Sequence, residues 1–176
     1  MTNQTASTAP TAPDAAEPAL KLDSFLPYRL NVCAILVSQA LSRIYAERYK
    51  IGVAEWRVLV TLGEFNMMTA KAVGLHSHMH KTKVSRAVVL LERRKLVARR
   101  ANRADLREAF LSLTPAGREI YAELAPSALK FSRQMMEAID PVDREAFCRA
   151  LARLKDRAER IAAESASDVA KDRDPS

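Results

Sequence analysis

The spacing of apolar residues changes once inside residues 69–113, and this change restricts the fold more than any other feature. Before residue 94, apolar residues recur every three or four positions, as on one face of a helix. Two later stretches, KLVARR and REAFLSL, alternate apolar and polar residues as strands do. The segment therefore predicts short helices followed by a β-hairpin.

Capping residues divide the helical part of this segment in two. Thr69 precedes AKAVGLHSH, and Thr82 precedes a run that keeps its apolar period to about Arg94. Each threonine can accept a hydrogen bond from a backbone N–H of the first helical turn. A turn is expected near Met79-His80. Two short helices, a tight turn and a two-stranded hairpin predict a winged helix-turn-helix.

Helical patterns also precede this unit. An apolar stripe runs through residues 20–50, and VAEWRVLVTLGEF predicts a shorter helix after Gly52. This shorter helix is expected to bury Trp56, Leu59, Val60 and Leu62. The NMM that follows it is expected to be a break before Thr69.

The C-terminal part of the chain is also helical. Thr114-Pro115 begins a helix that continues to about Ile139, and a last helix follows Asp140-Pro141. The predicted fold class is thus all-α with a small β-hairpin. The first and last helices are too long and too apolar for so small a core. We therefore expect them to pair with a second copy of the chain in a homodimer.

One folded body is expected at residues 20–164, with a DNA-reading lobe at about 53–113. The composition of residues 1–19 predicts a flexible leader, and residues 165–176 a flexible tail. No apolar run reaches the ~18 residues that span a bilayer, and the N-terminus does not resemble a secretory signal. Cys33 and Cys148 lie in apolar periodic contexts, which predicts buried thiols in a reducing compartment. A cytoplasmic protein with no membrane partner is expected.

The positive charge of the chain is concentrated in one segment. Residues 81–107 hold ten Lys or Arg against two acidic residues, a net charge of +8, whereas the whole chain carries +7. A helix in this segment fits the major groove of double-stranded DNA, and its N-terminus attracts phosphate. DNA is favoured over RNA because no pair of aromatic residues accompanies the basic ones.

The predicted DNA-contacting residues fall on this helix, on its N-terminal flank and at the hairpin tip. Basic residues supply phosphate or guanine contacts, and short hydroxyl residues hydrogen-bond to either. The hairpin tip can follow the phosphate backbone or enter the minor groove. The candidate DNA-binding residues are Lys71, His80, Lys81, Thr82, Lys83, Ser85, Arg86, Arg103, Asp105 and Arg107.

The stretches KTKVSRAVVLLERRKLV and ADLREAFLSLTPAG resemble the MarR family of bacterial transcriptional regulators. The first is similar to the family's recognition helix, and the second to its wing, where an Asp-x-Arg pair is followed by Leu-Thr-x-x-Gly. The wing pattern is matched by Asp105, Arg107, Leu113, Thr114 and Gly117. The resemblance covers residues 25–160. It implies a homodimer, joined by its first and last helices, that represses transcription from a pseudo-palindromic operator.

Two residues depart from the family pattern. Lys95 stands where the family usually has glycine, which implies that the turn from helix to strand closes differently. Leu106 occupies a position where many members carry a basic residue, so Arg103 becomes the candidate for the minor groove. Asp105 and Arg107 are then expected to hold the shape of the wing.

Three stretches, LDSFLPYRLN, RYKIGVAEWRVLVTLG and MTAKAVGLHSHMHKTKVSRAV, resemble regulators of aromatic-acid catabolism. Some of these respond to an aromatic acyl-CoA thioester such as p-coumaroyl-CoA. The resemblance implies an effector pocket between the dimer helices and the DNA-reading lobe. An aryl group needs an apolar slot, and the CoA phosphates need basic residues, for which Arg48, Lys50 and Lys71 are also available. The candidate effector-binding residues are Phe25, Arg29, Arg43, Trp56, Arg57, Met67, His76 and His78.

Several alternatives stay open. The effector could be a free aromatic carboxylate, or sensing could use a metal at His76, His78 and His80 or oxidation of Cys33. Trp56 could also be a core residue. An alternative to a sequence-specific regulator is a nonspecific architectural DNA-binding protein. No cofactor is expected, and neither is an enzyme, because the sequence has no Gly-rich phosphate loop and no nucleophile elbow.

Overall fold

The computed structural model of the chain describes residues 20–101 and 108–171, with side chains to residue 165. The chain divides within helix α1 (Leu26–Tyr49) into two compact units, one up to Ala40 and one from Leu41 on. In the first unit a 3-10 turn, η1 (Leu22–Ser24), precedes α1. Pro27 lies in the first turn of α1, where its missing N–H costs no hydrogen bond. Every described side chain of this unit is exposed or half-buried.

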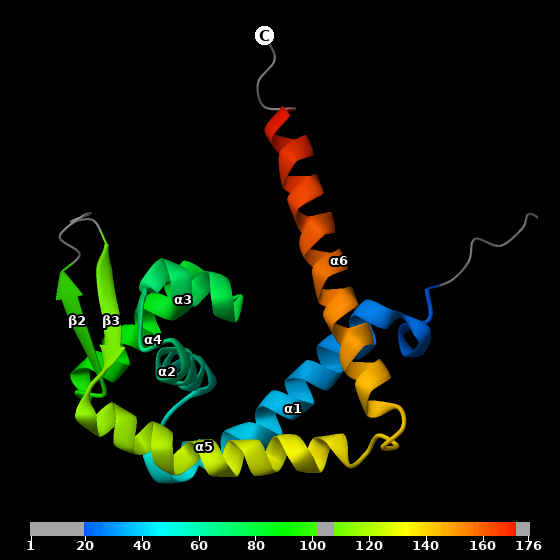
Figure 1. Ribbon diagram of the computed structural model, residues 1–176. Helices are drawn as coiled ribbons and strands as arrows, with labels where there is room; N and C mark the ends of the chain where they lie inside the picture. The colour runs from blue at the N-terminus through cyan, green and yellow to red at the C-terminus, as the bar shows by residue number, and fades with distance from the viewer. Residues whose placement is uncertain (1–19, 102–107, 172–176) are drawn as a thin grey trace, which may run out of the picture. The chain divides into compact units, whose positions relative to one another are not determined.

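The second unit contains the winged helix-turn-helix. Its elements are α2 (Val53–Phe65), β1 (Met67–Thr69), α3 (Ala70–Ser77), α4 (Lys81–Arg93), β2 (Val97–Ala101), β3 (Ala109–Leu113), α5 (Pro115–Met136) and α6 (Arg144–Lys171). Figure 1 shows α3 and α4 beside the β2–β3 pair, with α5 continuing directly from β3. The predicted fold class is confirmed. No described helix combines the length and the apolar character needed to cross a membrane.

The sheet has three strands, not the two that the sequence predicted. Its order is β1-β3-β2, and both pairings are antiparallel. Met67 pairs with Ser112 and Thr69 with Phe110, so the expected break after α2 is in fact an edge strand. A strand of three residues is too short to show an alternating pattern, which explains why the sequence did not reveal it.

One core holds α2, α3, α4, α5 and the sheet together. Trp56, Leu59 and Leu62 are buried as predicted, whereas Val60 is only half-buried. The other large side chains that are almost completely buried are Tyr45, Ile51, Val58, Val73, Val84, Val88, Leu91 and Leu111. Because one face of α4 packs into this core, the opposite face of α4 is exposed.

The C-terminus of α4 is tied to the C-terminus of α1. The Arg94 guanidinium donates hydrogen bonds to the backbone carbonyls of Lys50, at 3.0 Å, and Tyr49. A cation is favourable there because the last carbonyls of a helix carry partial negative charge. Arg48 lies over the Tyr49 ring and pairs with Glu123 of α5. The last turn of α1 therefore anchors both α4 and α5.

The turn from α4 to β2 closes as a Schellman motif. The N–H of Leu96 donates to Leu91 O at 2.9 Å, and the N–H of Lys95 donates to Glu92 O at 2.9 Å. Lys95 has the left-handed conformation, with φ 58°, that this motif requires and that glycine adopts most readily. The expectation that lysine would close the turn differently was wrong, because the two backbone hydrogen bonds hold lysine in the conformation of glycine.

Replacing Lys95 with glycine is expected to raise the free energy of unfolding by about 1 kcal/mol, because a residue with a Cβ is strained at positive φ. Lys95→Ala is the matched control, since it removes the same charge but keeps the Cβ. Urea denaturation at one protein concentration measures both variants. Equal stability of the two variants would contradict this account of the turn.

Cys33 and Cys148 are exposed, so the prediction that they are buried was wrong. Cys33 lies in the first unit, where no described side chain is buried. Cys148 lies on α6, whose described side chains from Glu145 on are all exposed. Apolar periodicity correctly marked one face of each helix, but it does not say whether the chain itself covers that face.

Candidate DNA-binding surface

The turn between α3 and α4 is fixed by backbone geometry. Thr69 caps α3 as predicted, its hydroxyl accepting a hydrogen bond from the N–H of Ala72 at 3.1 Å. At the other end, His78 adopts the left-handed conformation, with φ 49°. The N–H of Met79 then donates to Gly74 O at 3.0 Å, and the Met79 side chain is buried. The turn is therefore tight, as the sequence predicted.

His80, and not Thr82, is the N-cap of α4, so that prediction was wrong. The Nδ1 atom of His80 accepts a hydrogen bond from the N–H of Thr82 at 3.3 Å. A ring nitrogen accepts a hydrogen bond only when it carries no proton, so in this cap Nδ1 carries no proton. Thr82 lies instead in the first turn of α4 with an exposed side chain. Its hydroxyl thus stays available for a ligand.

Helix α4 has one buried face and one basic face. Val84, Ala87, Val88 and Leu91 face the core. The exposed side chains of its first half are Lys81, Thr82, Lys83, Ser85 and Arg86. No described residue forms an ion pair with the three basic ones. Their charge is therefore not neutralised by the described part of the chain.

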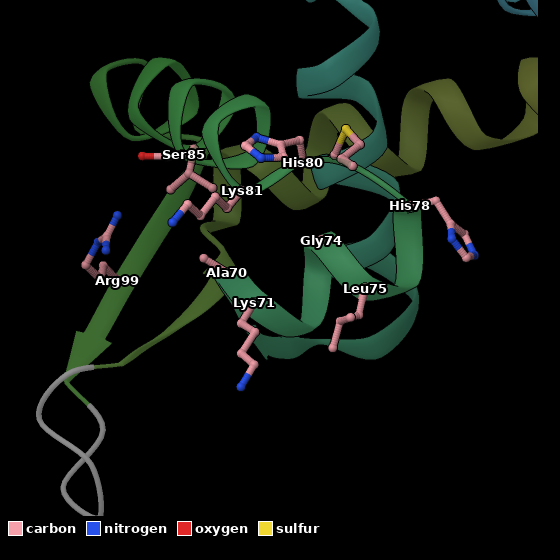
Figure 2. A pocket seen from close by; sticks show the side chains of 11 residues that line it. Ala70, Lys71, Gly74, Leu75, His78, His80, Lys81, Ser85 and Arg99 are labelled. Carbon is pink, nitrogen blue, oxygen red and sulfur yellow. The ribbon is translucent and has the colours of Figure 1, made fainter. Parts of the chain in front are cut away.

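A cavity of about 860 Å³ lies between α3, α4 and β2. Lys71, Lys81 and Arg99 contribute cations to it, and Figure 2 shows Lys81 and Ser85 turned to the same side as Arg99. Arg99 is paired with Glu92, with Nε–Oε1 at 3.0 Å and Nη2–Oε2 at 3.1 Å. This pairing raises the pKa of Arg99 and fixes β2 against α4. Lys71 and Lys81 supply the charge without a carboxylate partner among the described residues.

The tip of the wing lies outside the described residues. Arg103, Asp105, Arg107 and the departure at Leu106 all fall within residues 102–107. The strands that carry this tip are described, and their register ends with Ala101 opposite Ala109. The roles assigned to the wing residues therefore remain predictions.

The predicted effector-binding residues are distributed over both units. Phe25 and Arg29 belong to the first unit, and Arg43, on α1, is exposed in the second. Met67 lies on β1 with its side chain exposed. His76 packs edge-on against Phe65, with ring centroids 4.6 Å apart. The effector-binding roles of these residues therefore remain predictions.

Trp56 stacks on Tyr45, which the sequence did not single out. The ring centroids lie 4.9 Å apart, with 15° between the ring planes. Tyr45 is only 1% exposed, and its hydroxyl has no hydrogen-bond partner among the described residues. Burial raises the pKa of the Tyr45 phenol; Arg57 opposes this shift and Glu55 adds to it. An unpaired buried hydroxyl costs about 1–3 kcal/mol.

A second cavity, of about 720 Å³, lies between the N-terminus of α2 and the turn before α4. It brings together Arg57 and His78, which were predicted to bind effector, with His80 and Lys83, which were predicted to bind DNA. His78 Nε2 also lies 3.4 Å from a Glu159 carboxylate oxygen. Within the described ranges, no group of three or more His, Cys, Asp or Glu residues is arranged to hold a metal ion.

Comparison with known proteins connects this surface to one family. The sequence model of the MarR family matches residues 49–108. The fold is similar to a MarR-family transcriptional regulator from Silicibacter pomeroyi, at 26% identity and TM-score 0.65, over 76% of this chain and 90% of that one. No match was found among curated protein sequences.

Residues 49–108 thus resemble the MarR family, and the chain has the MarR fold.

Two further structures share the MarR fold. Sco3205 of Streptomyces coelicolor, a MarR-family regulator solved in complex with DNA, is 20% identical with TM-score 0.69, over 81% of this chain and 91% of its own. BpsR of Bordetella bronchiseptica, whose DNA binding is regulated by 6-hydroxynicotinic acid, is 21% identical with TM-score 0.70, over 79% and 99%. These likenesses concern the fold.

Sequence reasoning missed three features of the second unit. Tyr45 continues the apolar stripe of α1 at a helical interval, so periodicity could have revealed it. Arg99 was counted in the basic segment, but only the folded chain brings it to Glu92. Val89 is an apolar residue of α4, yet it is 39% exposed.

Proposed function

We propose that this chain is a sequence-specific repressor that binds a pseudo-palindromic operator as a homodimer and is released by an aromatic effector. The observation that carries the proposal is the outward face of α4. That face holds Lys81, Lys83 and Arg86 without ion-pair partners among the described residues, beside the exposed Thr82 and Ser85. Such a helix suits the major groove, where its N-terminal half contacts base edges and phosphates.

Exposed apolar faces on α1 and α6 support the homodimer. On α1 these side chains include Leu30, Ile35 and Leu36, each more than 40% exposed. On α6 they include Phe147, Leu151, Leu154 and Ile161, which recur at helical spacing. Apolar stripes of this length are normally covered, and a second copy of the chain carries the matching surfaces.

The Tyr45–Trp56 pair supports an aromatic effector. Both rings are buried, so an aryl group would reach them only if the packing between α1 and α2 opened; the unpaired Tyr45 hydroxyl would then donate a hydrogen bond to a carboxylate or carbonyl. BpsR, which shares the fold, responds to a hydroxylated aromatic acid. We extend the proposal to an aromatic acyl-CoA such as p-coumaroyl-CoA, with genes of aromatic-acid catabolism as targets.

The 720 Å³ cavity suggests how a thioester would release DNA. Arg57 on α2 and Lys83 on α4 both line it, together with His78 and His80. CoA carries several phosphate charges, and these would be attracted to such a cluster. A phosphate held at Lys83 occupies a residue that the operator also needs. Effector and DNA would then compete for the same positive charge.

Replacing Tyr45 with phenylalanine is expected to weaken effector binding about tenfold, because one hydrogen bond to the ligand is lost. The variant should be as stable as the wild type, or about 1 kcal/mol more stable, since it no longer buries an unpaired hydroxyl. Isothermal titration calorimetry measures the first effect and urea denaturation the second. If the Tyr45→Phe protein binds effector as tightly as the wild type, the hydroxyl does not contact the effector.

The proposal is tested by fluorescence anisotropy with labelled duplex from the region upstream of the chain's own coding sequence, against random duplex. The complex is then challenged separately with p-coumaroyl-CoA, p-coumarate, CoA alone and a zinc chelator. Release by the thioester alone supports the acyl-CoA mechanism, whereas release by the free acid supports a carboxylate effector. Release by chelator would favour a metal sensor. Equal affinity for both duplexes would favour an architectural protein.

A further inference from the structure

Val89 lies on the face of α4 that points away from the core. Thr82, Arg86, Val89 and Arg93 follow one another at intervals of four, three and four residues, which places them on one stripe of a helix. The buried residues Val84, Val88 and Leu91 lie on the opposite side. Val89 is 39% exposed, with Arg86 one turn before it and Arg93 one turn after it. It is thus an apolar residue in the middle of a basic stripe.

The chemistry of the major groove limits what such a residue can recognise. Base edges there present hydrogen-bond donors and acceptors, and a single apolar group, the C5-methyl of thymine. A valine side chain forms no hydrogen bonds, so the methyl group is the feature that it can contact favourably. Its χ1 angle is also restricted in a helix, so its two methyl groups are held in one orientation at little entropic cost.

If the basic residues around Val89 contact DNA, Val89 lies close to the base edges of the major groove. Arg86 and Arg93 can each reach a phosphate or a guanine edge, since a long side chain extends well beyond a valine. When both contact DNA, the helix surface between them is brought close to the groove floor. Glu92, which would repel phosphate, is turned to Arg99 and neutralised there. Val89 is therefore carried toward base edges rather than toward solvent.

We propose that Val89 is a specificity-determining residue that recognises the C5-methyl of a thymine in each operator half-site. The inference rests on the proposed operator binding of α4. It adds an apolar contact to the polar contacts of Thr82, Ser85 and Arg86. It also requires a thymine at one position of each half-site.

Thymine-to-uracil exchange tests the contact, because the two bases differ only in the C5-methyl group. The tightest-binding duplex is first selected from a random pool with the full chain, and each thymine is then replaced in turn by deoxyuridine. Anisotropy titrations compare the wild type, Val89→Ala and Leu90→Ala. Leu90 is the matched control, because it is similarly exposed, at 45%, but lies off the stripe. Thermal melts verify that both variants are folded.

For the wild type, exchange of a single contacted thymine should weaken binding roughly fourfold, the value of one buried methyl group. Val89→Ala should bind the thymine and uracil duplexes equally at that position, whereas Leu90→Ala should keep the wild-type difference. The inference is overturned if no single exchange weakens wild-type binding, or if Val89→Ala stays equally sensitive. A wild type that binds the selected duplex no more tightly than a random duplex would overturn operator recognition itself, which is a separate and recognisable result.

Discussion

The combined variant Lys81→Ala, Lys83→Ala and Arg86→Ala is expected to bind operator duplex more than about 1,000-fold more weakly than the wild type. Each substitution removes an exposed charge from α4 that no described carboxylate neutralises. Three contacts are lost in each half-site of the proposed dimer. At about 1 kcal/mol for each contact, the losses reach at least three powers of ten. The fold should be unaffected, because none of these side chains is buried.

Salt dependence separates phosphate contacts from base contacts in this experiment. The slope of log affinity against log salt concentration should fall by about 0.9 for each phosphate contact removed. The matched control removes the same charge from α5, by Arg118→Ala, Lys130→Ala and Arg133→Ala, where all three side chains are exposed. Operator affinity of the control should change little. A similar loss in both variants would mean that overall charge, rather than the surface of α4, attracts the DNA.

Replacing Gly117 with alanine is expected to lower the free energy of unfolding by about 3 kcal/mol. Gly117 is buried in the first turn of α5, against the turn that joins α4 to β2. A Cβ added there would overlap the carbonyl oxygen of Leu96 and lie 3.0 Å from its carbonyl carbon. The Leu96 carbonyl cannot move freely, since it accepts a hydrogen bond from the N–H of Thr114 at 3.0 Å.

The start of α5 would have to move away from this turn to admit the methyl group. Such a shift would break the bond that Thr114 Oγ1 donates to Lys95 O at 2.6 Å. Gly52→Ala is the control, because its Cβ would meet only the flexible Glu55 carboxylate. That control should cost no more than about 1 kcal/mol. Urea denaturation at equal protein concentration measures both, and a Gly117→Ala variant within 1 kcal/mol of the wild type would contradict the predicted overlap.

Local signals in the sequence were sufficient to predict most helices and the basic face of α4. Thr69 and Thr114 were recognised as caps because a cap depends only on residues within one turn. The buried residues of α2 and α4 followed from the helical period. The basic character of α4 also needed no tertiary information, because consecutive residues of one short helix must lie together in space.

Features that depend on distant partners could not be predicted in this way. Strand β1 exists because it pairs with β3, which lies some forty residues further along the chain and gives Met67–Thr69 no local signal. Tyr45 was overlooked because its significance comes from Trp56, which belongs to another helix.

The sequence by itself therefore determined the order of the helices, most of the residues that face the core and the basic face of the helix that we propose reads DNA. These depend on spacing and capping, which act over a few residues. Only the tertiary structure decided that Glu92 pairs with Arg99, that Met67–Thr69 pairs with β3 and that Val89 is left exposed among the basic residues. Each of these depends on which side chains the core leaves exposed and which it brings together.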